Sequence, residues 1–365
     1  MPRTIAHVVE LSGGGPTTVV LNLMRHQKAR GDNPVLIACR NLISPELVTE
    51  TGTDLLYTSS RNPLKIRGVV REIAPLIDKA RPDILHLHSA FAGLYGRLAL
   101  RHLKGARPKV VYCPHGWAFT QETSALKRTA YAMVEKRLLP MTDAIINLVH
   151  FEAVAARRYG VTCGRDYIIP LAVADPPDVV ARDLGLDPSK INLAFFGRFD
   201  RQKGLDHLLK AYQAKPRPGL TLTIFGSKLR GDQRDIAMGE GVTRFDWVPA
   251  KDIDSYMRAF DMVVMPSRWE AFALVSHEAM RNARPVLLSN RGGLPEFVID
   301  GFNGIMFDID NPTGLSDALD RLPELDLARM GRNARSVFES YCDFEANSAK
   351  VDQLYDTVLN DVERH

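Results

Sequence analysis

Short apolar runs alternate along this chain with amphipathic segments of helical period, and the alternation occurs twice. A strand of a parallel sheet reads as a continuous apolar run, because helices cover both faces of the sheet. The pattern therefore predicts an α/β protein built on parallel sheets. The strands expected in the first half are Thr4–Leu11, Pro34–Cys39, Ile84–His88, Lys109–Cys113, Ala144–Val149 and Tyr167–Ile169. Those expected in the second half are Ile191–Phe196, Leu220–Phe225, Thr243–Trp247, Met262–Met265, Pro285–Ser289 and Gly304–Phe307.

A proline-rich break at 175–178 separates the two alternations. We predict two doubly wound domains, 1–172 and 173–344, with a hinge near 171–180. The last segment, from Tyr341 to Asn360, has apolar residues at helical spacing and is predicted as a helix. A helix at about 345–365 would be free to pack back on the first domain.

Composition excludes several classes of protein. With 365 residues, 45% of them apolar and 25% charged, the chain has ordinary globular usage and room for two cores. Its four cysteines form no C-x-x-C pair, and no histidine stands at ligand spacing beside them, so neither disulfides nor a zinc site are predicted. No signal-peptide pattern and no apolar run near the roughly 18 residues of a membrane span are found. The expected location is the cytoplasm.

The modest net charge of +4 hides an asymmetry, because residues 1–170 carry +10 and the remainder carries −6. A basic half is suited to an anionic membrane, a nucleic acid or a phosphorylated ligand, and is also compatible with an ordinary solvated surface. The basic residues are dispersed and not interleaved with aromatic residues, so a nucleic acid is not expected as a partner.

A glycine-rich turn, Ser12-Gly13-Gly14-Gly15-Pro16, follows the first expected strand and precedes an expected helix, Thr17–Arg30. Such a turn lets a phosphate approach the backbone at a helix N-terminus. It matches neither the dinucleotide fingerprint nor the Walker loop, so nicotinamide and ATP chemistry are not predicted. A plain tight turn is the alternative.

Two cations follow the first strand of the second half, in Gly197-Arg198 and Lys203-Gly204. At the carboxyl edge of a parallel sheet, Arg198 and Lys203 are suited to a diphosphate, because arginine grips two oxygens and lysine adds a compact charge. Two solvated surface cations are the alternative.

Two acids, Glu270 and Glu278, follow the expected strand Met262–Met265 with seven residues between them. Glu270 falls in a loop and Glu278 about one turn into the next helix, so both are expected to face the interdomain cleft. Beside a phosphate site such acids require neutral partners, and sugar hydroxyls fit. Capping or solvent-exposed glutamates are the alternative.

Taken in order, these motifs resemble the retaining GT-B glycosyltransferases of family 4. The donor domain of that family is matched by Gly197-Arg198, Lys203-Gly204, the Glu270/Glu278 pair, and Gly292-Gly293-Leu294-Pro295-Glu296 before Gly301 and Gly304. Its acceptor domain is matched by the Gly13–Gly15 loop, His86-Leu87-His88 and His115-Gly116. The resemblance covers nearly the whole chain and implies two Rossmann-like domains facing each other across a cleft.

The resemblance implies a role for each matched residue. Arg198 and Lys203 would hold the donor diphosphate, Glu278 the ribose, and Glu270 the donor sugar near its anomeric carbon. Backbone N–H groups of Phe272, Ala273 and Leu274 would contact sugar and phosphate, Ser227 and Val248 would flank the base, and the Gly14/Gly15 loop would close on the diphosphate. His115 would bond the donor sugar or the acceptor.

The chain departs from the family pattern at a few positions. Ala273 and Ala283 stand where glycine is usual, and Leu171-Ala172 replaces an Asn-Gly pair. An alanine at 273 makes the loop less permissive of positive φ, which bears on the sugar contacts.

Neither a metal nor another cofactor is predicted. Asp252 and Asp254 begin an expected helix and are interpreted as caps, so cations and helix N-termini would stabilise the leaving diphosphate. Transfer with retention by front-face attack and a double displacement through Glu270 both remain open. His115 is interpreted as a hydrogen-bond partner, and His86 and His88 as core histidines rather than metal ligands, because no third ligand follows at suitable spacing.

The acceptor is expected in the N-terminal domain, where the segment 125–139 combines basic residues with Leu, Tyr, Met and Val. It is suited to an anionic membrane surface, and with the basic half it suggests a lipid-linked or glycolipid acceptor at the inner face of the cell membrane. A helix packed on its own sheet is the alternative.

The predicted function is transfer of a hexose, from UDP in preference to GDP or ADP, to a glycan in polysaccharide or glycolipid biosynthesis. A nucleotide-sugar epimerase of GT-B fold and a non-enzymatic anion-binding protein are the alternatives.

Overall fold

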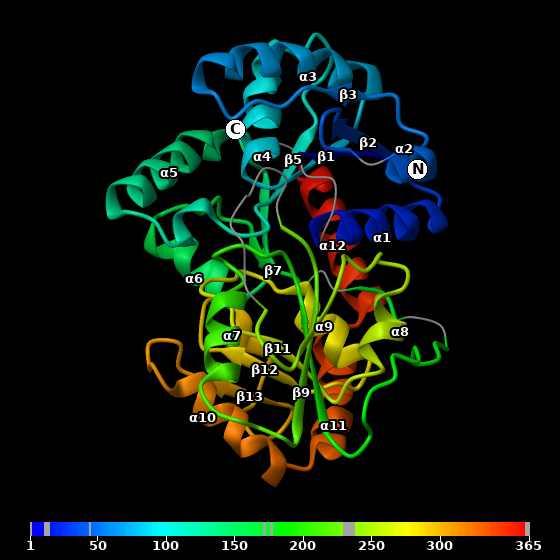
Figure 1. The fold of residues 1–365 in the computed structure, drawn as a ribbon. Helices are drawn as coiled ribbons and strands as arrows, with labels where there is room; N and C mark the ends of the chain where they lie inside the picture. Colours follow the sequence, from blue (N-terminus) through cyan, green and yellow to red (C-terminus); the bar gives the residue numbers. More distant parts are fainter. Residues whose placement is uncertain are drawn as a thin grey trace. The chain divides into compact units, whose positions relative to one another are not determined.

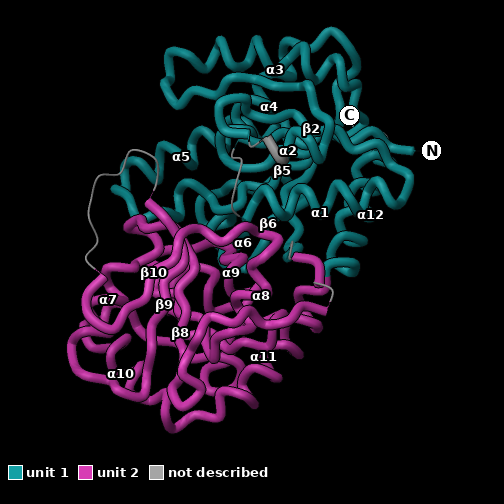
Figure 2. Tube along the Cα trace, turned by 45° about the vertical axis from the view of Figure 1, so that its right-hand side comes forward, with its two compact units in different colours: residues 1–171, 344–365 teal, residues 172–343 magenta. Residues whose placement is uncertain are grey.

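The computed structural model describes residues 2–10, 15–43, 45–170, 173–175, 178–228 and 238–361. The chain forms two compact units, one of residues 1–171 with 344–365 and one of residues 172–343 (Figure 2). The division expected from the sequence placed the boundaries at 172 and 344. Each unit is described below by itself.

Unit 1 contains a parallel sheet in the order β3-β2-β1-β4-β5-β6-β7 (Figure 1). Its strands are β1 (Thr4–Val9), β2 (Asn33–Cys39), β3 (Leu56–Tyr57), β4 (Ile84–His88), β5 (Lys109–Cys113), β6 (Ala144–Asn147) and β7 (Asp166–Ile168). The six strands expected from the sequence are present, with ends that differ by at most two residues. The short strand β3 was not expected, since two residues are too few to show a period.

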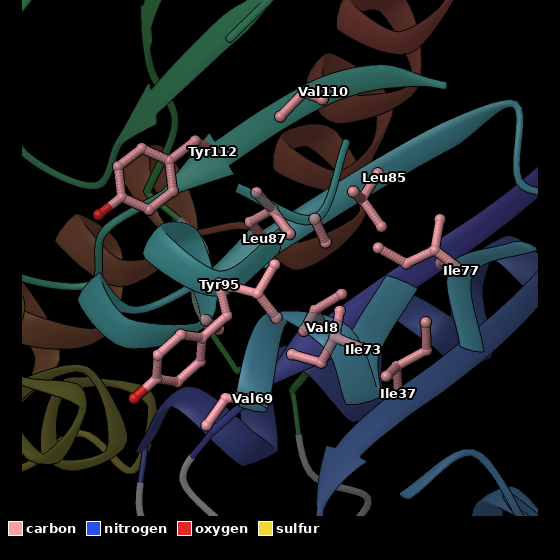
Figure 3. Packing of buried hydrophobic residues seen from close by; sticks show 14 of the residues in the cluster. Val8, Ile37, Val69, Ile73, Ile77, Leu85, Leu87, Tyr95, Val110 and Tyr112 are labelled. Atoms are coloured by element: carbon pink, nitrogen blue, oxygen red, sulfur yellow. The ribbon is translucent and has the colours of Figure 1, made fainter. Parts of the chain in front are cut away.

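Helices cover both faces of this sheet. They are α1 (Gly15–Ala29), α2 (Pro45–Thr51), α3 (Ile66–Ala80), α4 (Ala90–Ala99), α5 (Ala125–Leu138), α6 (His150–Arg158) and α12 (Phe344–Asn360). Figure 3 shows the side chains of β1, β2, β4 and β5 that pack with those of α3 and α4 on one face. On the other face, residues of α1 pack against Val9, Leu36 and Ala38. Alternate residues of β1 and β2 therefore point to different cores, as the pleat requires.

The C-terminal helix α12 belongs to unit 1, where ion pairs bind it to β1 and α1. Arg3 contacts Asp32 at 2.6 Å, Asp352 at 3.2 Å and Asp356 at 2.8 Å. His26 of α1 also contacts Asp352, at 2.9 Å. The predicted single helix beginning at Tyr341 is wrong in one respect, because α11 of unit 2 ends at Tyr341 and α12 begins afresh at Phe344.

Unit 2 contains a second parallel sheet, in the order β10-β9-β8-β11-β12-β13. Its strands are β8 (Ile191–Phe196), β9 (Leu220–Phe225), β10 (Val242–Phe245), β11 (Met262–Met265), β12 (Val286–Ser289) and β13 (Gly304–Phe307). Its helices are α7 (Leu205–Gln213), α8 (Ile253–Met257), α9 (Leu274–Arg281), α10 (Gly314–Arg321) and α11 (Leu327–Tyr341). Residues of α7 and α10 pack on one face, and residues of α8 and α9 on the other.

Single turns of 3-10 helix occur in both units, at Pro63–Lys65, Leu100–His102, Ala118–Thr120, Leu139–Met141, Leu294–Phe297 and Leu322–Glu324. Within the described ranges, the helices lack the combination of length and hydropathy that crossing a bilayer would require.

In both sheets the first strand lies between the second and the fourth in sequence order. The crossovers leaving the first strand and the fourth strand consequently run in opposite directions. Between them, at the carboxyl ends of the strands, a doubly wound sheet leaves room for a ligand. In unit 1 this switch point lies between β1 and β4, and in unit 2 between β8 and β11.

The two alanines that replace family glycines behave differently. Ala273 has φ −92° and ψ 99°, so the loop does not use the positive φ that a glycine at this position would permit. Ala283, just after α9, has φ +55°, a left-handed conformation in which a Cβ is strained. Its N–H donates to the carbonyl oxygen of Met280 at 3.0 Å, which closes the C-terminus of α9.

Replacing Ala283 with glycine is expected to stabilise unit 2 by about 1 kcal/mol, because the left-handed strain of the Cβ exceeds the chain entropy that glycine adds to the unfolded state. Differential scanning calorimetry should show an increase of about 3 °C in the corresponding transition. Ala211→Gly, in the middle of α7, is the matched control and should lower it instead. A lower Tm for Ala283→Gly would contradict the strain argument.

Candidate functional site

The loops after β8 and β11 meet at the switch point of unit 2, and they carry the predicted donor-site residues. The loop after β8 contains Arg198 and Lys203, and the loop after β11 contains Glu270. Lys203 Nζ and Glu270 Oε1 form an ion pair between the two loops. Both side chains are mostly buried, since 18% of Lys203 and 6% of Glu270 are exposed. The ion pair therefore brings together two residues that are 67 positions apart in the sequence.

Further hydrogen bonds fix the ends of this ion pair. Ser267 donates to Glu270 Oε1 at 3.2 Å. The backbone N–H of Lys203 donates to Asp200 Oδ1 at 3.0 Å, and Arg198 Nε contacts the other oxygen of Asp200 at 2.9 Å. Arg198 also donates to Gln202 at 3.2 Å and remains substantially exposed. Arg198 is thus held beside the pair with room to contact a ligand.

Close backbone approaches require glycine at Gly204, in the loop after β8, and at Gly292, in the loop after β12. Gly204 has φ +67°, and a Cβ there would collide with the carbonyl oxygen of Pro266. Gly292 has φ +61°, and a Cβ there would collide with the carbonyl oxygen of Glu270. The N–H of Gly293 donates to that same oxygen at 3.0 Å. Glycines of the matched motifs therefore set how closely the loops approach.

The N-terminus of α9 faces the loop that carries Glu270. No described residue accepts a hydrogen bond from the backbone N–H groups of Phe272, Ala273 or Leu274. Free N–H groups and the helix dipole favour an anion at this end. His277 packs behind them, with its ring stacked on Phe272 at 4.2 Å and Nδ1 3.0 Å from the carbonyl oxygen of Ala273.

Glu278 lies one turn into α9, as predicted, and is buried. Burial raises the pKa of Glu278 to about 7, with a further contribution from Asp254 and an opposing one from Arg281. The interpretation of Asp254 as a helix cap is wrong. Its carboxylate forms a buried bidentate ion pair with Arg281 at 2.8 Å and accepts a hydrogen bond from Asn282. Asp252 stands at the N-cap position of α8 without a side-chain cap bond.

The remaining donor-site predictions fall at the edges of unit 2 and in unit 1. The carbonyl oxygen of Ser227 accepts a hydrogen bond from the N–H of Phe199 at 3.0 Å, and Val248 packs in the core beside β9. Gly15 is the first residue of α1, which begins two residues before the expected Thr17. Gly14 lies outside the described residues.

In unit 1, His115 follows β5 and is half-buried, with φ +49°. Its Nε2 is 3.0 Å from Nδ1 of His88, and Nε2 of His88 is 3.0 Å from Nδ1 of His7. His86 contacts the hydroxyl of Tyr355 at 2.7 Å through Nδ1, while its buried Nε2 has no partner among the described residues. Burial lowers the pKa of His7 and His115 to about 4 and the pKa of His86 and His88 well below 6.5.

The expectation that no third ligand follows His86 and His88 at suitable spacing misses His7. A ring nitrogen of His7 lies within 4.8 Å of theirs. The pairing of β1 with β4 brings them together, because His7 is in register with His86. The rings are nevertheless arranged for hydrogen bonds. With centroids 5.3 Å apart and nitrogens 3.0 Å apart, the lone pair of His7 points at the ring of His88 and not toward a shared ion. A metal ion would require the rings to turn.

The two switch points thus differ in chemistry. Unit 2 offers two cations, two acids and free N–H groups, which are suited to a diphosphate joined to a sugar and a ribose. Unit 1 offers neutral histidines, which suit hydroxyl groups.

Solved structures share this fold. Sucrose-phosphate synthase from Thermosynechococcus elongatus has a TM-score of 0.80 at 23% identity, covering 97% of this chain and 98% of that chain. HepE from Anabaena, in complex with UDP and glucose, has a TM-score of 0.79 at 18% identity, covering 97% and 100%. The two doubly wound units therefore form the GT-B fold of glycosyltransferases.

Sequence comparisons agree. Residues 13–175 match the family model "Glycosyltransferase Family 4" and residues 179–337 match "Glycosyl transferases group 1". An uncharacterized 41.2 kDa protein in the cps region of Klebsiella pneumoniae is 30% identical over 87% of this chain and 89% of its own length. D-inositol 3-phosphate glycosyltransferase of Pseudarthrobacter chlorophenolicus is 36% identical over 74% and 71%. UDP-Gal:alpha-D-GlcNAc-diphosphoundecaprenol alpha-1,3-galactosyltransferase of Escherichia coli is 26% identical over 78% of each chain. The chain belongs to glycosyltransferase family 4.

The pKa of Glu278 predicts a pH-dependent stability. A carboxyl group with a pKa of 4.5 when unfolded and about 7 when folded stabilises the fold below pH 4.5, and this contribution is lost as the pH rises to about 7. Glu278→Gln stays neutral, so at pH 8 it should exceed the parent protein by about 3 kcal/mol in free energy of unfolding. Urea unfolding between pH 4.5 and 8 measures this difference.

Glu324→Gln, at an exposed position, is the matched control and should leave the pH profile of the parent unchanged. A constant difference between Glu278→Gln and the parent over this range would show that the pKa of Glu278 is the same in the folded and the unfolded protein.

Proposed function

We propose that this protein transfers a hexose from a UDP-sugar to a lipid-linked glycan, with retention of the anomeric configuration and without a metal ion. The observation that carries the donor half of this proposal is the Lys203–Glu270 ion pair at the switch point, beside Arg198 and the N-terminus of α9. Lysine and arginine would bind the diphosphate, and the acid would turn to the sugar.

The proposed roles follow the chemistry of each group. Arg198 and Lys203 neutralise the diphosphate as it leaves, aided by the free N–H groups of 272–274. Glu278 accepts hydrogen bonds from the ribose hydroxyls when ionised. Ser227 and Val248 flank the base. Two cations and a helix N-terminus supply the positive charge for which a metal ion would otherwise be used.

Front-face attack is favoured over a double displacement by the environment of Glu270. When the diphosphate takes Lys203, Oε1 of Glu270 keeps the hydrogen bond from Ser267 at 3.2 Å, and a carboxylate oxygen engaged in this way is a weaker nucleophile than a free one. In a front-face reaction the leaving phosphate accepts the acceptor proton as the new bond forms. The sugar then keeps its configuration without a covalent intermediate.

The donor proposal predicts how variants bind UDP in the presence of EDTA. Lys203→Ala removes a charge-assisted contact and leaves Glu270 unpaired beside the diphosphate, so UDP affinity should fall about 10- to 100-fold by isothermal titration calorimetry. Glu270→Gln frees the lysine, so UDP affinity should be retained while sugar transfer is lost. Loss of UDP binding on adding EDTA to the parent protein would refute metal independence.

Lys210→Ala, at an exposed position of α7, is the matched control and should bind UDP as the parent does. GDP, ADP and dTDP serve as competing ligands, and tighter binding of one of these would overturn the choice of UDP. Product analysis separates transfer from epimerisation, because an epimerase would isomerise the UDP-sugar without an acceptor.

The proposal of a lipid-linked acceptor rests on helix α5 of unit 1. Its buried residues are confined to the stripe Ala132, Glu135 and Leu138. Large apolar side chains are instead exposed, with 80% of Leu126, 45% of Met133 and 44% of Val134 accessible. Lys127, Lys136 and Arg137 accompany them at exposed positions. Apolar side chains flanked by cations are suited to the surface of an anionic membrane.

The relative from Escherichia coli is named for an acceptor carried on diphosphoundecaprenol, and this supports a lipid-linked glycan for the present chain. We therefore place the enzyme at the inner face of the cell membrane, in polysaccharide or glycolipid biosynthesis. The acceptor would reach the enzyme from the bilayer.

Vesicle co-sedimentation tests the membrane contact. The protein should bind vesicles with anionic lipid and not neutral vesicles, and added salt should release it. Leu126→Asp should reduce binding about tenfold, because it removes an apolar anchor and adds a repelled charge. Leu64→Asp is the matched control, since Leu64 is 91% exposed but lies in unit 1 away from α5 in sequence. Equal losses in both variants would contradict a role for α5.

A further inference from the structure

A chain of hydrogen bonds runs through unit 1 from α1 to His115. It begins at Gln27, whose Oε1 is 2.8 Å from Nε2 of His7. It continues through the two contacts of 3.0 Å from His7 to His88 and from His88 to His115. The ring centroids are 5.3 Å apart at each step, so the nitrogens lie nearly on the line between the rings. The chain joins a buried helix residue to the half-buried residue that follows β5.

Each ring in this chain must donate at one nitrogen and accept at the other. A neutral imidazole has one N–H and one lone pair, so fixing the proton on one ring fixes the direction of the next bond. Burial keeps the pKa of these histidines below 6.5, so the rings are neutral near pH 7. The direction of the whole chain therefore depends on the group at its buried end.

That group is the side-chain amide of Gln27. Its oxygen faces His7, and its nitrogen donates to the hydroxyl of Tyr355 at 3.4 Å. The hydroxyl of Tyr355 also contacts Nδ1 of His86, at 2.7 Å. His7 must then donate from Nε2 to the amide oxygen and accept at Nδ1. Because Nδ1 of His7 accepts, His88 must donate from Nε2 and accept at Nδ1. For the same reason His115 must donate from Nε2 to Nδ1 of His88, so both rings carry their protons on Nε2.

His115, at the far end of this series of hydrogen bonds, has the features of a functional position. His115 has φ +49°, a conformation that costs free energy for a residue with a Cβ. Its Nε2 is occupied by His88, and its Nδ1 has no hydrogen-bond partner among the described residues. With the proton on Nε2, that free Nδ1 presents a lone pair, which accepts a hydrogen bond from a hydroxyl group.

From this network we infer that Gln27, acting through His7 and His88, holds His115 in the Nε2–H tautomer, so that Nδ1 accepts a hydrogen bond from a substrate hydroxyl. Gln27, His7 and His88 are positioning residues, since none of them is proposed to touch the substrate. The tautomer follows from the contacts in unit 1 alone. The assignment of the hydroxyl to a sugar substrate rests on the proposed function.

Nitrogen-15 NMR of histidine-labelled protein tests the tautomer, because protonated and unprotonated ring nitrogens have well-separated shifts. In the parent protein at pH 7, His115 should show a protonated Nε2 and an unprotonated Nδ1. Comparison with the spectrum of His115→Gln assigns the signals. A protonated Nδ1 on His115 in the parent would overturn the inference, whatever the substrate is.

Gln27→Met tests the control exerted from the buried end. The variant leaves His7 Nε2 without an acceptor, and a buried N–H without a partner is costly. The hydrogen bonds from His7 to His88 and from His88 to His115 should therefore reverse their direction. His115 should then carry its proton on Nδ1. His7→Leu cuts the chain one ring later and should have the same effect on His115, which provides a second variant if the first does not fold. An unchanged His115 tautomer in a folded variant would overturn the inference.

Gln213→Met, at an exposed position of unit 2, is the matched control and should leave the His115 signals unchanged. Under the proposed function, reversal in Gln27→Met should lower kcat for transfer about tenfold while UDP affinity stays at the parent value. A reversed tautomer with parental kcat would refute the contact between Nδ1 and the substrate hydroxyl. Failure of UDP to bind the parent protein would refute the proposed donor and leave the NMR result standing.

Discussion

The arrangement of the donor site depends on the ion pair between Lys203 and Glu270. Each residue lies in a loop after a different strand, and the two strands β8 and β11 are neighbours only because the sheet reverses its winding between them. The pair neutralises two mostly buried charges, and Ser267 and Asp200 satisfy groups around it. Glycines 204 and 292 permit the loops to approach this closely. The contact between Lys203 and Glu270 holds the two loops of the site together. In the proposed function a diphosphate takes the place of Glu270 on the lysine, and the acid turns to the sugar.

The switch point of unit 1, between β1 and β4, carries neutral groups instead of an ion pair. Histidines on β1 and β4 lie at the switch point, where charged residues would be costly because α1 and α12 cover them. Burial keeps the rings uncharged, and in-line hydrogen bonds satisfy most of their nitrogens. Helix α12 is essential to this arrangement, since it supplies Tyr355 and is itself held by the ion pair of Asp352 with Arg3 and by the hydrogen bond of Asp352 with His26. Helix α12 and strand β1, from opposite ends of the sequence, thus contribute to the same core.

Much of the fold could be predicted, because parallel strands buried on both faces leave an apolar signature that needs no partner to be recognised. Of the thirteen strands in the part of the chain that the structure describes, twelve were expected within two residues, and the two-residue β3 gave no signal. Predictions failed where a side chain serves a distant partner. Asp254 has the sequence position of a cap but pairs with Arg281. His7 was overlooked because one histidine in a strand has no meaning until its neighbour strand is known.

The sequence by itself determined the two alternations of strand and helix, the positions of the glycines, and the charged residues that identify the family, because these depend on local periodicity and on residue type. Only the tertiary structure decided which of those residues meet. It paired Lys203 with Glu270 across two strands, joined Gln27 to His115 through two rings, and buried Glu278 far enough to raise its pKa to about 7. Distances and burial arise from packing between segments far apart in the chain, and no local pattern encodes them.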